Sequence, residues 1–215
     1  MPKPQRSRSE IAAVRDNILE TACDILFRDG FERLSMRRLA RELGMTAANI
    51  YNYFRNKDEL YLAIQKHGFE MLEARLSLAA EGERTPETRL RSVAREYLAF
   101  GMDQAHYYEI MLNRHGPKYA DYAPTDMEPV ARAEKDAAME ALGVVLAVAV
   151  DAADTAGLSA DRAKRLLYHL WFTLHGFITL YNTRTIQEVE DDPGALAHAV
   201  IEDFLQRVEA ELFAN

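Results

Sequence analysis

Apolar residues recur at intervals of three or four along most of the 215-residue chain. This spacing is typical of amphipathic helices, and no stretch shows the strict alternation of a half-buried β-strand. The first apolar stripe consists of Ile11, Val14, Ile18, Ala22 and Ile25. The pattern therefore predicts an all-α protein of about nine helices.

Helix-capping residues set the limits of several of these helices. Ser35 fits the N-cap of a short helix at about 35–43, and Gly44 fits the left-handed residue that ends it. A further helix is expected at 46–54. Prolines and a glycine in 115–126 indicate the longest loop of the chain.

The charge is distributed unevenly along the chain. The formal net charge is -8, but residues 1–60 contain 11 Lys and Arg against 9 Asp and Glu, whereas the remainder holds 15 against 25. Such asymmetry indicates a nucleic-acid-binding end joined to a different kind of domain. A hydrophobic content of 48% excludes a disordered chain.

Neither disulfides nor membrane segments are expected. Cys23 is the single cysteine, and the longest apolar run, at 141–150, is far shorter than the roughly 20 residues that cross a bilayer. The first ten residues lack the apolar stretch of a signal peptide. A reducing, cytoplasmic location and no contact with a membrane are therefore predicted.

The segment 35–60 has the spacing of a helix-turn-helix. Two short helices can cross steeply when the residue at their contact is small and the turn accepts an unusual backbone conformation, and Ala40 and Gly44 meet these needs. The second helix of such a motif enters the major groove and reads bases with its N-terminal residues. The apolar side of the pair consists of Leu39, Leu43, Ile50 and Phe54.

Side chains of this segment suit contacts with DNA. Asn49 can bond an adenine edge and alanine methyl groups can pack on a thymine methyl, while Arg, Lys, Ser and Tyr side chains suit phosphates. The predicted contact residues are Ser35, Arg37, Thr46, Ala47, Ala48, Asn49, Tyr51, Tyr53 and Lys57. A basic arm of Lys3, Arg6 and Arg8 can add a minor-groove or backbone contact.

Structural roles remain open for the same residues. Ser35 and Thr46 cap helices in any case, and Tyr51 or Tyr53 can simply pack on neighbouring helices. The arginines at 37, 38 and 41 can form a solvated face paired with Glu42 or Asp24.

Residues 11–60 resemble the N-terminal domain of the TetR family of one-component bacterial transcriptional regulators. The matching positions are Ser35, Gly44, Met45, Thr46, Tyr51, Phe54, Lys57 and Leu60. Two departures are Tyr53, where the family usually has His, and Ala48, where Gly is common. The resemblance implies a DNA-binding domain at 1–56 and a ligand-binding and dimerisation domain at 57–215.

The segment 168–180 resembles the Trp-x-x-x-His-Gly motif of one C-terminal subgroup of that family, with Trp171, His175 and Gly176. Tyr168, Trp171 and His175 share one helix face and can line a ligand pocket. The alternative is an ordinary core histidine beside core aromatics. The predicted ligand-binding residues are Tyr97, Met102, Tyr107, Met111, Tyr168, Trp171 and His175, with His67 as a further candidate.

No cofactor, metal site or catalytic centre is predicted. His169 and His175 lie on different helix faces, and the sequence has no cysteine cluster, P-loop, dinucleotide fingerprint or nucleophile elbow. An all-helical enzyme therefore has no support from the residues.

The resemblance implies a homodimer formed through the last two apolar stretches, 159–183 and 193–213. Such a dimer would bind a palindromic operator in double-stranded DNA as a repressor, and a small apolar or aromatic effector would release it. The alternative is a constitutive DNA-binding protein with a filled C-terminal core and no effector.

Overall fold

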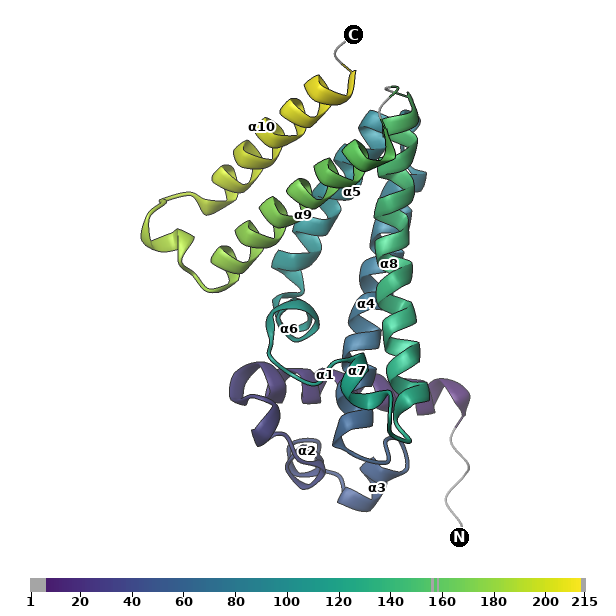
Figure 1. The fold of residues 1–215 in the computed structure, drawn as a ribbon. Coiled ribbons are helices and arrows are strands. Elements are labelled where there is room, and N and C mark those ends of the chain that lie inside the picture. Colours follow the sequence, from purple (N-terminus) through teal and green to yellow (C-terminus); the bar gives the residue numbers. More distant parts are fainter. Residues whose placement is uncertain (1–6, 156, 158, 214–215) are drawn as a thin grey trace. The chain divides into compact units, whose positions relative to one another are not determined.

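A computed structural model describes residues 7–155, 157 and 159–213, without the side chains at 208, 209 and 211–213. Within these ranges every regular element is helical, and ten α-helices occur where about nine were predicted (Figure 1). None of these helices is long and apolar enough to cross a membrane. Lys3 and Arg6 of the predicted basic arm lie outside the described residues, and Arg8 is the first residue of α1 rather than part of an arm.

The chain forms two compact units. The first comprises Met1–Gly68 with His106–Asp136, and the second comprises Phe69–Ala105 with Ala137–Asn215. This division differs from the predicted boundary after residue 56, because a later segment joins the N-terminal residues. As limits of functional domains, 1–56 and 57–215 stay a prediction.

The first unit begins with a long helix and two short ones. These are α1 (Arg8–Asp29), the 3-10 turn η1 (Phe31–Arg33), α2 (Met36–Glu42) and α3 (Ala47–Tyr51), followed by the start of α4 (Lys57–Glu81). Their apolar faces form one core, whose fully buried side chains include Ile18, Ile25, Leu39, Ile50 and Leu60. The helix predicted at 46–54 is shorter because Asn52 ends it.

The remainder of the first unit includes three short elements that were not predicted from the sequence, followed by the start of a long helix. It consists of α6 (Ala105–Tyr108), a π-helical turn (Glu109–Asn113), α7 (Tyr119–Tyr122) and the start of α8 (Glu128–Thr155). Thus part of the predicted loop at 115–126 is helical. The buried side chain of Gln65 in α4 donates a hydrogen bond from Nε2 to the carbonyl oxygen of Ile110 at 3.2 Å, which ties the π turn to α4.

The second unit is a bundle of long helices. It contains the later parts of α4 and α8 together with α5 (Pro86–Asp103), α9 (Ala160–Asn182), the 3-10 turn η3 (Ile186–Glu188) and α10 (Pro193–Phe213). Helix α9 packs on α5, and α10 runs antiparallel beside α9 (Figure 1). Arg95 of α5 pairs with Glu202 of α10 at 2.6 Å, which links the last helix to the bundle.

Candidate nucleic-acid interface and ligand region

Two side-chain caps and one glycine define the turn between α2 and α3. Ser35 Oγ accepts a hydrogen bond from the backbone N–H of Arg38 at 3.2 Å, and Thr46 Oγ1 accepts one from that of Asn49 at 3.2 Å. Gly44 has φ +63°, the left-handed conformation that favours glycine. Both predicted caps and the predicted turn residue are therefore confirmed.

One side of α3 is anchored while the other is exposed. Ile50 is fully buried, whereas Tyr51 is 53% exposed. Thr46 and Ala48 are also exposed, and Ala47, Asn49 and Tyr53 are partly buried. The buried side chain of Ile50 therefore holds α3 in place. Three of the predicted contact residues in this segment, Thr46, Ala48 and Tyr51, have exposed side chains.

The three arginines of α2 have different environments. Arg38 pairs with Asp29 and with Glu42, and Arg28 bonds to the same two carboxylates. These guanidinium groups hold the pKa of the Asp29 carboxyl below its usual value, with Arg28 as the larger cause. The alternative interpretation, in which an arginine of α2 pairs with Glu42, is therefore confirmed for Arg38.

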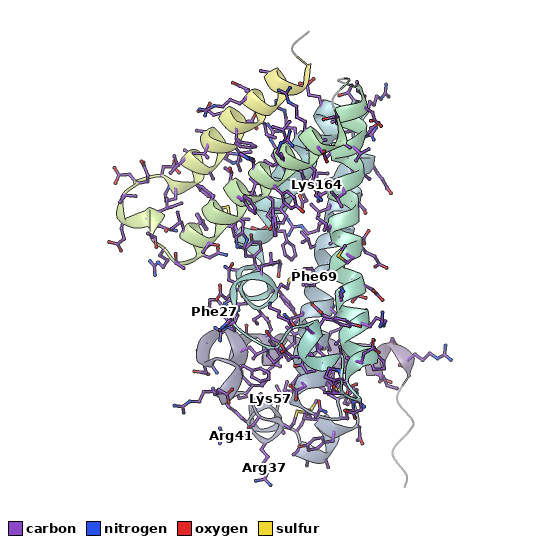
Figure 2. All side chains as sticks on the ribbon, in the orientation of Figure 1. Phe27, Arg37, Arg41, Lys57, Phe69 and Lys164 are labelled. Atoms are coloured by element: carbon purple, nitrogen blue, oxygen red, sulfur yellow. The ribbon has the colours of Figure 1, made fainter. Side chains whose placement is uncertain are left out.

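Arg37 and Arg41 have no ion pair among the described residues, and both are exposed. Their side chains extend away from α2 (Figure 2). Since they lie four residues apart, they share one helix face. From the sequence, Arg37 was named as a predicted contact and Arg41 was placed only in a solvated face; the structure gives both side chains the same exposed environment.

Lys57, a predicted phosphate contact, is partly buried at the start of α4. Its Nζ lies 3.8 Å from the centroid of the Phe31 ring, within the range of a cation–π interaction. This contact holds the ammonium group against η1, in the same unit as α2 and α3. Phe31 in turn packs edge-on against Tyr61, with ring centroids 5.0 Å apart.

The predicted ligand-binding residues fall into two groups, one in each unit. In the second unit, Trp171 Nε1 donates a hydrogen bond to the hydroxyl of Tyr97 at 2.9 Å. The Trp171 ring lies 6.5 Å from that of Tyr168 and 6.2 Å from that of His175. Met102 is partly buried on α5. Burial lowers the pKa of His175, which favours a neutral imidazole at pH 7.

Tyr107 and Met111 belong to the first unit and pack on Gly68 of α4, where an added Cβ would lie 3.2 Å from the Tyr107 ring and in steric conflict with Met111. His67 lies beside Tyr107, with ring centroids 5.7 Å apart. Burial raises the pKa of Tyr107. Tyr107, Met111 and His67 all belong to the first unit, whereas Tyr97, Trp171 and His175 belong to the second.

No group of three potential metal ligands occurs among the described residues. Cys23 is buried in α1, and burial raises the pKa of its thiol to about 12. The thiol is therefore protonated at neutral pH.

Two family models match the chain. Residues 18–64 match the model described as bacterial regulatory proteins, tetR family. Residues 90–204, more than half of the chain, match the tetracyclin repressor-like C-terminal domain. The chain belongs to the TetR family. The helix-turn-helix of α2 and α3 lies inside the first match, and Trp171 and His175 lie inside the second.

Two relatives of this TetR-family chain are named as transcriptional regulators. It is 24% identical over 196 residues to an uncharacterized HTH-type transcriptional regulator, Rv0681 of Mycobacterium tuberculosis, covering 91% of this chain and 80% of the relative. It is 32% identical over 71 residues to the HTH-type transcriptional repressor Rv1474c of the same organism. That match covers 33% of this chain and spans only 38% of the repressor.

Solved structures show the same fold. The transcriptional regulator FadR from Bacillus subtilis, solved in complex with stearoyl-CoA, superposes with a TM-score of 0.67 at 13% identity. The match covers 88% of this chain and 97% of that one. At this identity the likeness concerns the fold alone.

Proposed function

We propose that this TetR-family protein is a transcriptional repressor that binds a palindromic DNA operator as a homodimer and is released from it by a small apolar or aromatic ligand. The observation that carries the proposal is the α2–α3 arrangement, which exposes Tyr51 and leaves Arg37 and Arg41 without acidic partners in the described chain. The relatives named as transcriptional regulators support it.

In this proposal α3 lies in the major groove, and the role of each residue follows from its place on that helix. Thr46, Ala47, Ala48 and Asn49 at its N-terminal end contact base edges, as recognition helices do. Ser35, Arg37, Tyr51, Tyr53 and Lys57 contact phosphates, which fix the register of the protein on DNA without reading sequence. Ser35 and Thr46 can each cap a helix and contact DNA at the same time, because a hydroxyl group has one donor and two acceptor positions.

The exposed face of α9 supports the proposed dimer. Tyr168, Phe172, Gly176 and Leu180 recur at intervals of four, and Phe172 is 62% exposed. A Cβ added to Gly176 would meet no atom within 4 Å, so this position leaves space for a second helix to approach closely. Contiguous exposed apolar surface is typical of an interaction site.

Helix α10 is the second part of the proposed interface. Leu196, Val200 and Phe204 are spaced four apart and are only partly buried. Two copies of α9 and α10 would form the four-helix interface that the family resemblance implies. The test is Phe172→Glu, which should convert a dimer into a monomer in sedimentation velocity.

A matched control for the dimer is Leu78→Glu, because Leu78 of α4 is 74% exposed and lies on neither of the last two helices. This variant should sediment as the parent protein does. If Phe172→Glu stays dimeric, the assignment of the interface to α9 is wrong.

The proposed effector site surrounds Trp171 in the second unit, and the subgroup motif of Trp171, His175 and Gly176 supports it. Aromatic walls that end in polar groups suit an apolar ligand with one hydrogen-bonding group. Because the sequence contains one tryptophan, indole fluorescence reports this region alone. Small apolar and aromatic compounds are the first to titrate, and stearoyl-CoA, the larger and charged ligand named for FadR, is a separate comparison.

A constitutive DNA-binding protein remains the second candidate. The hydrogen bond between Trp171 and Tyr97 favours it, since both polar groups already have a partner inside the second unit. The two candidates differ in one measurement. An effector-responsive repressor predicts a compound that both changes Trp171 fluorescence and weakens DNA binding, whereas the constitutive protein predicts none.

The test of DNA binding is a gel-shift assay with the DNA upstream of the protein's own gene, carried out over a range of salt concentrations. Tyr51→Ala combined with Lys57→Ala should weaken binding at least tenfold. The matched control is Tyr119→Ala combined with Lys135→Ala, a Tyr–Lys pair of the same unit outside α2 and α3 whose ammonium and ring lie 4.5 Å apart. Equal binding by both double variants would refute the assigned contacts.

A further inference from the structure

The first half of α1 is exposed, although its second half lies in the core of the first unit. Every residue from 8 to 17 is exposed except Val14, which is partly buried. From residue 18 onward, the same helix buries Ile18, Leu19, Ala22, Cys23, Ile25 and Leu26. The start of α1 therefore presents its side chains to solvent on all sides.

The charged residues of α1 are separated onto two sides of the helix. At about 100° per residue, Arg8 and Arg15 lie within about 20° of each other, and Leu19 follows Arg15 on the same side one turn later. The acidic residues lie between about 100° and 180° away from Arg15 around the axis, and they are Glu10, Asp16, Glu20 and Asp24. The basic side thus continues the stripe that packs into the core of the first unit.

Arg15 is fixed on an aromatic ring beside the end of α3. Its Cζ lies 4.6 Å from the centroid of the Phe54 ring, within the range of a cation–π interaction. Phe54 is 1% exposed, and its backbone N–H donates a hydrogen bond to the carbonyl oxygen of Ile50 at 3.1 Å. The guanidinium group is therefore held next to the C-terminal end of α3.

The hydrogen-bond donors of Arg15 are available to a partner. No hydrogen bond or ion pair of its side chain occurs among the described residues, whereas Arg38 binds the carboxylates of Asp29 and Glu42. An aromatic ring covers only one flat face of a guanidinium group, so the N–H groups in its plane can still donate. Because the ring contact already fixes the side chain, little conformational entropy is lost when it binds an anion.

A phosphate of the DNA backbone fits this position. The major groove is roughly 12 Å wide, about the diameter of a helix with its side chains, so a group beside a helix in the groove lies close to the phosphates of its walls. Arginine binds phosphate through two parallel hydrogen bonds. A base contact is less suitable, because Arg15 lies beside the C-terminal end of α3 and recognition helices read bases with their N-terminal residues.

We propose that Arg15 of α1 is a further contact with the DNA backbone, which binds one phosphate in each half-site. This inference rests on the proposed function and extends the interface from α2 and α3 to α1. The alternative is a purely structural role, in which the guanidinium group only covers Phe54. The two roles differ in salt dependence, because only a phosphate contact releases counterions from the DNA.

Gel shifts of the full chain with the DNA upstream of its own gene, at several salt concentrations, separate the two roles. Arg15→Met removes the charge but keeps an unbranched side chain over Phe54, and it should bind several-fold more weakly. Its slope of log affinity against log salt should be shallower by about 0.9 for each monomer bound. Arg15→Lys keeps the charge and should keep the slope of the parent. Weaker binding by Arg15→Met with an unchanged slope would establish the structural role and overturn the proposal.

Ethylation of the DNA phosphates locates the contact. An ethyl group on the phosphate that Arg15 binds should interfere with the parent protein and have no effect on Arg15→Met. One phosphate in each half-site should therefore disappear from the interference pattern of the variant. Identical patterns for the two proteins would also overturn the proposal.

Two control variants test whether bulk charge explains the result. Arg84→Met makes the same change of charge at an exposed position of the second unit, and Glu20→Gln changes an exposed residue on the acidic side of α1. Both should keep the slope of the parent. Slopes that shift in the controls as much as in Arg15→Met would refute a placed contact. Circular dichroism checks that each variant is folded, and Arg15→Gln replaces Arg15→Met if the latter loses helix content.

Failure of this inference can be distinguished from failure of the proposed function. If the parent binds the DNA and Tyr51→Ala with Lys57→Ala weakens binding, but Arg15→Met keeps both the slope and the interference pattern of the parent, only the role of Arg15 is refuted. A parent protein that binds no duplex DNA would refute both.

Discussion

Ile178 of α9 lies directly on the backbone of Gly101 in α5. A Cβ added at Gly101 would come within 2.6 Å of Cδ1 of Ile178. The carbonyl oxygen of the same glycine accepts a hydrogen bond from Asn182 Nδ2 at 2.9 Å. The contact between these two helices therefore depends on the absence of a side chain at position 101.

Gly101→Ala should destabilise the protein by about 1–3 kcal/mol, the usual effect of overpacking a close contact. Gly143→Ala is the matched control, because a Cβ in that exposed position of α8 meets no atom within 4 Å. The control should gain about 0.5–1 kcal/mol from helix propensity. Urea unfolding followed by circular dichroism measures both changes, and equal effects of the two substitutions would contradict the packing argument.

Arg37 and Arg41 should act as additive phosphate contacts. Replacement of either by Ala removes one positive charge that has no acidic partner in the described chain, so each variant should bind operator DNA several-fold more weakly. The slope of log affinity against log salt should become shallower by about 0.9 for each phosphate that is no longer neutralised. Gel shifts at several salt concentrations give the slope.

The control for that charge change is Arg84→Ala, an exposed arginine just before α5. Its salt slope should equal that of the parent protein. A slope that falls equally in all three variants would indicate bulk charge rather than placed contacts.

Asp29 should make the stability of the first unit depend on pH. Its ion pairs with Arg28 and Arg38 lower its pKa in the folded chain below the ordinary value of 3.8. The stabilisation is therefore present above pH 3.8 and is lost as the pH falls through the lower, folded-state pKa. Asp29→Asn should be less stable than the parent at pH 7, and the difference should close in acid.

The measurement is the midpoint of urea unfolding at each pH, repeated at high salt, where the difference should also shrink because these groups are partly exposed to solvent. Asp16→Asn serves as the control on the same helix, since the structure describes no ion pair for Asp16. A difference between Asp29→Asn and the parent that is constant at all pH values would argue against ionisation as its cause.

Cys23 should be unreactive in the folded protein at pH 8. Burial raises its pKa to about 12, and only the thiolate reacts at a useful rate. A thiol-specific chromogenic reagent should modify one cysteine per chain in concentrated guanidinium chloride and almost none without it. Rapid labelling of the folded protein would show that α1 opens readily or that the residue is accessible.

The parts of the fold that could be predicted from the sequence depend on near neighbours. Ser35, Gly44 and Thr46 act within one helical turn of their own positions, so capping rules and backbone preferences were sufficient to predict the helix-turn-helix. The DNA-contact residues on it stay a prediction, because the fold of one chain does not determine which exposed groups meet a phosphate or a base.

The parts that could not be predicted depend on residues far apart in the chain. The π turn at Glu109–Asn113 is held by Gln65, and no local pattern indicates a donor that comes from another helix. Likewise, composition could not tell which arginine of α2 would pair with Asp29. The answer, Arg38, follows from where α1 places that carboxylate.

The π turn also determines how the fold would respond to the loss of one residue from this segment. A π turn contains one residue more than an α turn, so the loss of a single residue from Glu109–Asn113 would restore a regular helix. The point at which the chain leaves the turn, at Arg114, would then shift by about 100° around the helix axis. Arg114 would leave the end of α1 as a result. A variant that is one residue shorter at this point is therefore expected to lack the hydrogen bond of 2.9 Å that Arg114 Nη2 donates to the carbonyl oxygen of Phe27 in α1.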